Sequence, residues 1–124
     1  MSSLHLTVTT ETFPLAEVFT ISRGSRTRAE VLTASVTQGG ITGWGECVPY
    51  GRYGETLESV MDQINTLPAD FERQSLYDLL PAGAARNAVD CALWDLEAKR
   101  EQKRVWELAK LPEPGPRITA FTLS

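Results

Sequence analysis

The chain has 124 residues, of which 42% are hydrophobic and 23% charged, and its 12 Lys and Arg against 16 Asp and Glu give a net charge of −4. This composition is typical of one folded domain and argues against intrinsic disorder, a membrane span and nucleic acid as the main partner. The two cysteines, Cys47 and Cys91, lie far apart in the sequence, which favours a reduced, cytoplasmic protein over a disulfide framework.

Residues 1–48 predict a small antiparallel sheet. Apolar and polar residues alternate over residues 4–9, over 29–37 and over 41–48, and a turn at Gly39-Gly40 joins the last two strands. Pro14 is expected to end the first strand because proline cannot donate a ladder hydrogen bond. Residues 17–27 are then expected to form a loop.

The hydrophobic period changes after residue 56. Apolar positions over residues 57–67 fall on one helical face, and Pro68 ends that helix. Ser75 is a plausible N-cap for a second, short helix. A longer apolar stripe over residues 85–96 predicts a third helix, and residues 105–111 favour one more short helical turn.

Three prolines in residues 112–116 predict a semi-rigid linker. The residues after it, 118–124, have a β-type sequence but no partner strand nearby. We therefore expect a first domain over residues 1–111, a linker over 112–117, and the beginning of a second domain in 118–124.

The glycine-rich stretch of residues 39–45 lies in a hairpin and does not lead into a helix, as a phosphate-binding loop would. Gly43 and Gly45 are therefore interpreted as positions of close backbone approach or of a bulge. Both cysteines lack metal-ligand spacing and are interpreted as small core residues.

The acidic residues suggest no catalytic or metal site. Glu55, Glu58 and Asp62 lie away from the apolar face of their helix and are interpreted as a solvated face. Asp90 and Asp95 lie on different sides of the long helix and are interpreted as structural hydrogen-bonding partners. The single histidine, His5, has no acid beside it and is interpreted as structural.

Two segments remain as candidates for ligand contact. One carries Arg23, Arg26 and Arg28, and the other is the loop from Tyr50 to Tyr53. Arginine in a loop suits carboxylate and phosphate groups, whereas a solvated loop has the same composition. The residues alone leave both interpretations open.

Four stretches resemble a known family. Residues 43–55 (GWGECVPYGRYGE) and 83–99 (GAARNAVDCALWDLEAK) resemble the N-terminal domain of the enolase superfamily, in its muconate-lactonizing subgroup. Residues 21–26 (ISRGSR) and 80–87 (LPAGAARN) extend the similarity to the L-Ala-D/L-Glu dipeptide epimerases. The resemblance implies an α+β capping domain, with a three-stranded antiparallel sheet followed by three to four helices. It also implies that residues 118–124 are the first strand of a (β/α) barrel that the chain otherwise lacks.

The resemblance implies a role without catalysis for the chain by itself. In this family, barrel lysines move the α-proton, and three barrel acids hold an Mg²⁺ ion that stabilises an enolate intermediate. None of these positions exists in this sequence, so we expect no catalytic residue and no metal ligand here. The expected function is that of the capping and substrate-specificity domain of an Mg²⁺-dependent dipeptide epimerase, an isomerase, and the chain alone should be inactive.

The resemblance also assigns substrate contacts and partners. Arg26 first, and Arg23 second, are expected to bind the Glu carboxylate of a dipeptide, while Tyr50 and Tyr53 pack over the substrate. The expected partners are the barrel domain, the dipeptide and further copies of this chain, through the barrel-facing surface and residues 118–124. The alternatives are the cap of another muconate-lactonizing or N-acylamino-acid racemase-type enzyme, and a free-standing interaction module.

Overall fold

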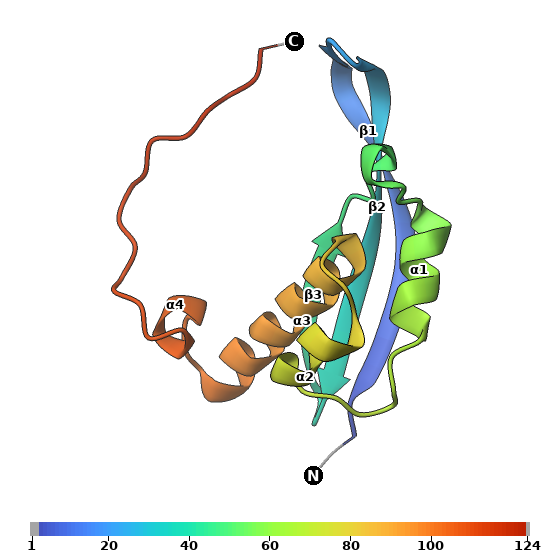
Figure 1. The fold of residues 1–124 in the computed structure, drawn as a ribbon. Coiled ribbons are helices and arrows are strands. Elements are labelled where there is room, and N and C mark those ends of the chain that lie inside the picture. The colour runs from blue at the N-terminus through green and yellow to red at the C-terminus, as the bar shows by residue number, and fades with distance from the viewer. Residues whose placement is uncertain (1–2, 124) are drawn as a thin grey trace.

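The computed structural model describes residues 3–123 and shows a sheet covered by helices on one face (Figure 1). The antiparallel sheet has the order β1-β2-β3, with β1 at His5–Ile21, β2 at Gly24–Gln38 and β3 at Ile41–Cys47. The helices that follow are η1 (Gly51–Tyr53), α1 (Leu57–Asn65), α2 (Arg73–Leu79), α3 (Ala84–Glu101) and α4 (Val105–Leu108). The predicted α+β class, with a three-stranded sheet followed by helices, is confirmed.

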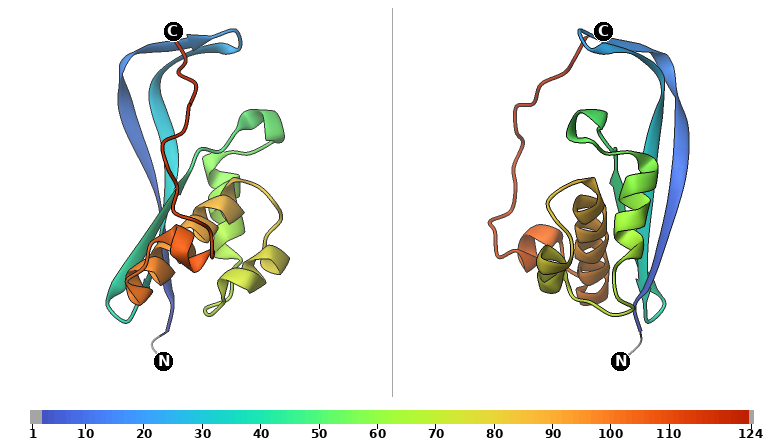
Figure 2. Two further views of the ribbon diagram at one scale, coloured as in Figure 1. Left: turned by 90° about the vertical axis from the view of Figure 1, so that its left-hand side faces the viewer. Right: turned by 45° about the vertical axis from the view of Figure 1, so that its right-hand side comes forward.

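The β1–β2 hairpin is longer than the sequence predicts. Both strands run past the helices to a turn at Ser22-Arg23, and the end of the hairpin bends to the side on which η1 lies (Figure 2). The predictions that Pro14 ends the first strand and that residues 17–27 form a loop were therefore wrong. Because β1 is an edge strand, it tolerates a proline, and a register shift between Pro14 and Phe19 absorbs the irregularity.

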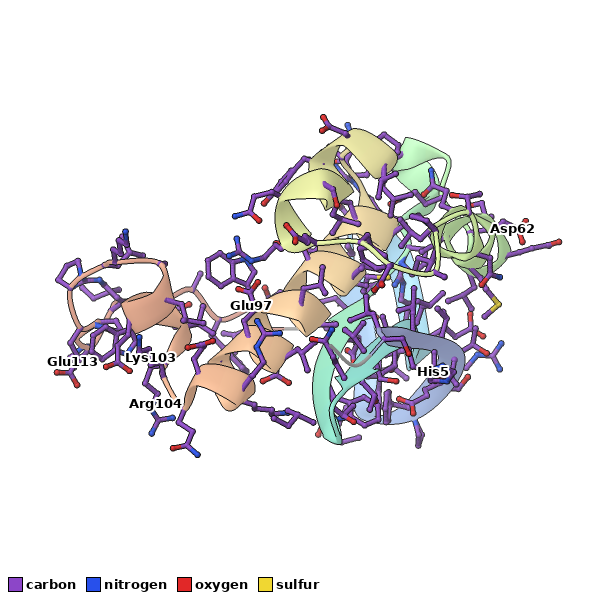
Figure 3. All side chains as sticks on the ribbon, turned by 90° about the horizontal axis from the view of Figure 1, so that it is seen from below. His5, Asp62, Glu97, Lys103, Arg104 and Glu113 are labelled. Atoms are coloured by element: carbon purple, nitrogen blue, oxygen red, sulfur yellow. The ribbon has the colours of Figure 1, made fainter. Side chains whose placement is uncertain are left out.

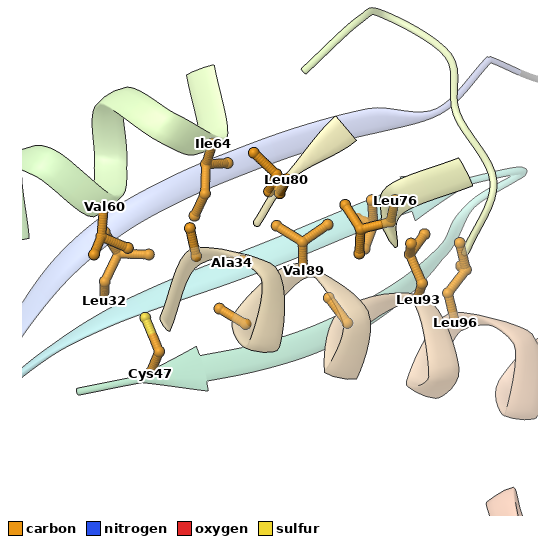
Figure 4. Close-up of a cluster of buried hydrophobic side chains, with 14 residues drawn as sticks. Leu32, Ala34, Cys47, Val60, Ile64, Leu76, Leu80, Val89, Leu93 and Leu96 are labelled. Carbon is orange, nitrogen blue, oxygen red and sulfur yellow. The ribbon is translucent and has the colours of Figure 1, made fainter. Parts of the chain in front are cut away.

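The hydrophobic core lies between the sheet and the three longer helices. Alternate residues of β2 point into it, and Figure 4 shows Leu32 of β2 beside Val60 of α1. The face predicted from the alternation of residues 29–37 is confirmed, because Leu32, Ala34 and Val36 are fully buried. The remaining helical contributions come from Ile64 of α1, Leu76 of α2 and a row along α3 that comprises Ala85, Ala88, Val89, Ala92, Leu93 and Leu96.

Strand β3 and helix α3 approach each other through glycine. A Cβ atom at Gly45 would fall on the carbonyl oxygen of Ala88, and one at Gly43 on the carbonyl oxygen of Ala92. Both obstacles are helix backbone, which no rotamer change can move. The interpretation of these glycines as positions of close backbone approach is confirmed, and no bulge is needed to explain them.

Local hydrogen bonds explain where two helices begin. Thr56 caps α1, its hydroxyl accepting from the Ser59 amide while the Ser59 hydroxyl accepts from the Thr56 amide. Helix α2 begins two residues before the predicted cap: Glu72 is its N-cap, and Ser75 accepts a hydrogen bond from the Glu72 amide. Ser75 is therefore the N3 residue of the capping box and lies within α2, so it is not the N-cap.

The segment after α4 has no helix or strand. Residues 111–123 are exposed and run from α4 toward the end of the hairpin (Figures 1 and 2). A strand requires a hydrogen-bonded neighbour, and none of the described residues supplies one to this segment. The linker at 112–117 and the barrel strand at 118–124 stay predictions, and residue 124 lies outside the described residues.

Candidate functional site

A hollow lies between the end of the hairpin and the loop that follows β3. Its volume is about 1110 Å³. Its lining includes four large aliphatic or phenyl side chains, namely Leu15, Phe19, Ile21 and Val48. Its charged groups are four arginines, Arg23, Arg26, Arg28 and Arg52, against the single acid Glu17. The hollow is therefore apolar in its walls and strongly positive in its charge.

The alternation of β2 places Arg26 and Arg28 in this hollow. They occupy the same row of alternate residues as the buried core positions of β2, beyond the point where the helices end. Arg28 forms an exposed ion pair with Glu30 at 3.4 Å. The Arg26 backbone pairs with Phe19 in the β1–β2 ladder, but its side chain makes no ion pair or hydrogen bond with any residue between 3 and 123. Its guanidinium is thus available to a ligand.

Arg26 also lines a second, neighbouring hollow of about 750 Å³ between the hairpin and the start of α1. That hollow carries acidic side chains, Glu30 and Glu58, beside the arginines. The larger hollow has the more uniform positive charge, so it is the better candidate for an anionic ligand.

Arg23 occupies the turn of the hairpin and already has a partner. Its Nη1 donates a hydrogen bond of 2.8 Å to the hydroxyl oxygen of Tyr50 in the opposite loop. The Tyr50 ring in turn meets the Tyr53 ring edge to face, with 5.5 Å between the centroids. Arg23 therefore joins the two segments that enclose the hollow.

Glu55 connects the same loop to α3. One carboxylate oxygen accepts from the Tyr50 amide at 3.2 Å, and the other accepts from the Ala84 amide, at the first residue of α3, at 2.8 Å. The interpretation of Glu55 as part of a solvated helical face was wrong, because it precedes α1 and is half-buried. Glu58 and Asp62 are exposed as predicted, and Figure 3 shows Asp62 at the periphery.

The structure brings together three of the four predicted substrate residues. Arg23, Arg26 and Tyr50 line one hollow. Tyr53 does not line it: its side chain is 77% exposed and contacts the ring of Tyr50. Arg52 belongs to the candidate loop but was not among the predicted substrate contacts, and it also lines the hollow. The sequence interpretation missed the apolar wall of β1, because residues 17–27 were expected to be a loop. The alternation of Phe19 and Ile21 was the available signal.

The two aspartates of α3 differ from each other. Asp95 accepts hydrogen bonds from the Trp44 amide at 2.8 Å and from Lys99 Nζ at 2.7 Å, which confirms its structural role. Burial alone would raise the pKa of the Asp95 carboxyl, but these hydrogen bonds and the Lys99 charge lower it below its usual value. The interpretation of Asp90 as a hydrogen-bonding partner was wrong for its Oδ1, which is buried without a partner among the described residues.

The two cysteines also differ. Cys47 is buried under α3, and burial, with Glu55 and Glu46 nearby, raises the pKa of its thiol to about 11. Cys91 is exposed, so its interpretation as a core residue was wrong. Its pKa is raised by the burial it retains and by the charge of Asp90. Cys91 lies one residue off the apolar stripe of α3, a signal that the helical period already contained.

Two kinds of feature are absent from the described part of the chain, a cluster of metal ligands and a membrane-spanning helix. Residues 3–123 contain no group of three or more His, Cys, Asp or Glu side chains arranged to hold a metal ion. These side chains therefore do not form a site for Mg²⁺, an ion that the resemblance assigns to barrel residues. Within the same range, no helix combines the length and the apolar character that crossing a bilayer requires. His5 is exposed on β1 (Figure 3).

The chain is similar in sequence and structure to known proteins. The L-Ala-D/L-Glu epimerase of Escherichia coli is 48% identical over 117 residues, which are 91% of this chain and 36% of that protein. The chain thus spans about a third of the length of that curated relative. A crystal structure of an enolase family member from Agrobacterium tumefaciens, with homology to dipeptide epimerases and with bound sodium and L-Ala-L-Glu, is 50% identical. It superposes with a TM-score of 0.81 over 88% of this chain and 35% of that one.

A second solved structure is more distant but has the same fold. The dipeptide epimerase of Methylococcus capsulatus, complexed with Mg and L-Arg-D-Lys, is 31% identical, with a TM-score of 0.72 over 87% of this chain and 34% of that one. The family described as the mandelate racemase / muconate lactonizing enzyme N-terminal domain matches residues 3–109. The chain therefore belongs to this N-terminal domain family of the enolase superfamily, and over most of its length it is similar to the corresponding part of dipeptide epimerases.

Proposed function

We propose that this chain is the capping and substrate-specificity domain of an Mg²⁺-dependent dipeptide epimerase of the L-Ala-D/L-Glu type. The observation that carries the proposal is Arg26, whose guanidinium has no partner among residues 3–123 and lies in an apolar, positively charged hollow. A cation in such a place is stabilised by an anionic ligand, and the planar guanidinium fits a carboxylate in a bidentate manner. The Glu side chain of a dipeptide provides such a carboxylate.

The relatives support this choice of ligand. The E. coli relative is named for L-Ala-D/L-Glu, and the A. tumefaciens structure holds L-Ala-L-Glu. The M. capsulatus structure holds Mg with a dipeptide of basic residues. Similar proteins thus hold dipeptides with different side chains. We therefore propose that the cap determines which dipeptide side chain is preferred.

Epimerisation exchanges one α-proton and needs groups that remove and return it. The described residues offer no metal cluster, so we assign the proton transfer and the Mg²⁺ ion to a barrel domain in the complete enzyme. Within this chain, Arg26 would bind the side-chain carboxylate, while the apolar hairpin wall and Tyr50 exclude water around it. Exclusion of water strengthens the ion pair by lowering the local dielectric constant.

Exposed apolar residues favour a barrel domain as the partner. Trp44, Val48, Leu79 and Val105 are each more than two-fifths exposed. A second domain packed against these elements would remove this apolar area from water. The same surface would allow copies of the isolated chain to associate.

A chimaeric enzyme tests the proposal. Residues 1–111 replace the matching segment of the E. coli epimerase, and α-proton exchange with Mg²⁺ in D₂O is followed by NMR for L-Ala-L-Glu and for L-Ala-L-Leu. Arg26→Ala should lower kcat/KM for L-Ala-L-Glu about 100-fold, which corresponds to about 2.7 kcal/mol for a lost charged hydrogen-bonded pair. The L-Ala-L-Leu reaction should change less than about threefold, because it lacks the carboxylate.

Arg52→Ala is the matched control, because Arg52 lines the same hollow from the opposite segment. Its effect should be smaller and equal for the two dipeptides. An equal loss for both dipeptides in Arg26→Ala would contradict the assignment of Arg26. Turnover of an N-acylated amino acid in place of either dipeptide would favour the alternative, an N-acylamino-acid racemase-type cap.

The intact mass of the protein from its native source tests the partner. A mass about three times the 13.7 kDa of this chain would agree with a cap that belongs to a complete enzyme. A mass of 13.7 kDa would favour the free-standing interaction module instead.

A further inference from the structure

We propose that Arg23 is a positioning residue, which fastens the end of the β1–β2 hairpin to the loop after β3 and does not itself bind substrate. Its only described side-chain partner is the Tyr50 hydroxyl, at 2.8 Å. The two residues come from opposite sides of the hollow. We call this hydrogen bond, together with the Glu55 bridge to α3, the clasp.

The clasp continues into the rigid part of the domain. Tyr50 donates its amide hydrogen to Glu55, and the second Glu55 oxygen accepts from the Ala84 amide at the start of α3. Helix α3 is the central helix of the core. A contact at the hairpin turn is thereby transmitted through one tyrosine and one carboxylate to the best-packed element of the fold.

The hairpin needs such an anchor. From Glu11 to Ile21 every residue of β1 is exposed, and the core ends before this part of the hairpin. A two-stranded hairpin without a packed face is marginally stable, so its position over the loop is set by few contacts. Tyr50 provides one of these contacts through its hydrogen bond with Arg23. The edge-to-face contact with Tyr53 limits the orientation of the Tyr50 ring.

This arrangement separates the roles of the two arginines. Arg23 Nη1 donates its hydrogen bond to the Tyr50 hydroxyl. The side chain of Arg26, three residues later, has no partner among residues 3–123. The clasp holds the strand that carries Arg26 in place, so that its guanidinium enters the hollow at a defined position. The consequence for substrate rests on the proposed function, but the clasp itself does not.

Hydrogen exchange of the 124-residue chain tests the clasp directly. The variants are Arg23→Gln, Tyr50→Phe and the double variant. Each should increase amide exchange in residues 20–26 and 50–54 about fivefold, which corresponds to about 1 kcal/mol for one hydrogen bond. The double variant should show no further increase, because both changes remove the same interaction. Arg23→Lys keeps a cationic donor and should restore part of the protection.

Arg52→Gln is the control, because it makes the same charge change in the same hollow, in the loop that carries Tyr50, but removes no side-chain hydrogen bond between described residues. It should leave exchange in both segments unchanged, and exchange in α3 should be the same in all variants. Unchanged exchange at residues 50–54 in Arg23→Gln, or an additive double variant, would overturn the clasp.

The chimaeric enzyme separates failure of the clasp from failure of the proposed function. Arg23→Gln should raise KM for L-Ala-L-Glu and L-Ala-L-Leu by the same factor, because it loosens the hollow for both. A loss selective for L-Ala-L-Glu would show instead that Arg23 binds the carboxylate. If neither dipeptide is turned over, the proposed function fails while the exchange result still decides the clasp.

Discussion

The close approach of β3 and α3 gives the sharpest test of the fold. Gly45→Ala would place a Cβ on the Ala88 carbonyl oxygen, with the Ala92 nitrogen at 2.8 Å. Since both atoms are helix backbone, the sheet and α3 must move apart, and this separates β3 from the row of buried α3 side chains. The change therefore strains the core at its most tightly packed layer.

We expect this strain to cost about 3 kcal/mol, at the upper end of the range for overpacked cores. In a domain of this size, that is a large share of a free energy of unfolding of about 5–15 kcal/mol. It should lower Tm by about 10 °C. Urea unfolding followed by the fluorescence of the three tryptophans measures the change in free energy.

Gly51→Ala is the matched control. A Cβ at Gly51 meets no atom within 4 Å, and its φ lies outside the left-handed region. This variant should be neutral or stabilised by about 0.5 kcal/mol, because alanine restricts the unfolded chain. The reasoning is refuted if Gly45→Ala unfolds within about 0.5 kcal/mol of the parent chain, or if Gly51→Ala loses as much.

Three further outcomes are expected. At pH 8 a thiol reagent should modify one cysteine per folded chain, Cys91, because Cys47 is buried with a pKa of about 11; a folded Cys91→Ser chain that still reacts would contradict this. The lowered pKa of Asp95 stabilises the fold above the unfolded pKa of about 4, and this contribution is lost as pH falls through the folded pKa. Asp95→Asn should therefore flatten the acid limb of the stability profile, with a loss under about 1 kcal/mol at pH 7, because the group is partly exposed. Light scattering should show self-association that weakens when residues 118–124, with their exposed apolar side chains, are removed; a monomer in both cases would refute it.

Much of the fold could be predicted because it depends on local periodicity. The alternation of residues 29–37 identified the buried face of β2, and the apolar stripe of residues 85–96 identified α3. The two glycines of β3 indicated close packing because a missing side chain in a strand has few other uses. These patterns depend only on residues that are close together in the sequence.

The candidate site was predicted only as a set of residues. Arginine and tyrosine in two connecting segments indicated ligand contact, and the hollow does bring Arg23, Arg26 and Tyr50 together. Their separate roles depend on partners far away in the sequence. Arg23 meets Tyr50 across 27 residues, and the Tyr50 amide reaches α3 only through Glu55.

The sequence by itself determined the order of the elements, the buried faces and the family, because side-chain periodicity and short motifs are local. The tertiary structure alone decided that β1 passes Pro14, since a proline is tolerated only where the strand has a free edge. It also decided that the Arg23 side chain is hydrogen-bonded, whereas that of Arg26 has no partner in the part of the chain that the structure describes. A hydrogen bond between two segments exists only when the whole chain has folded and brought its donor and acceptor within about 3 Å of each other.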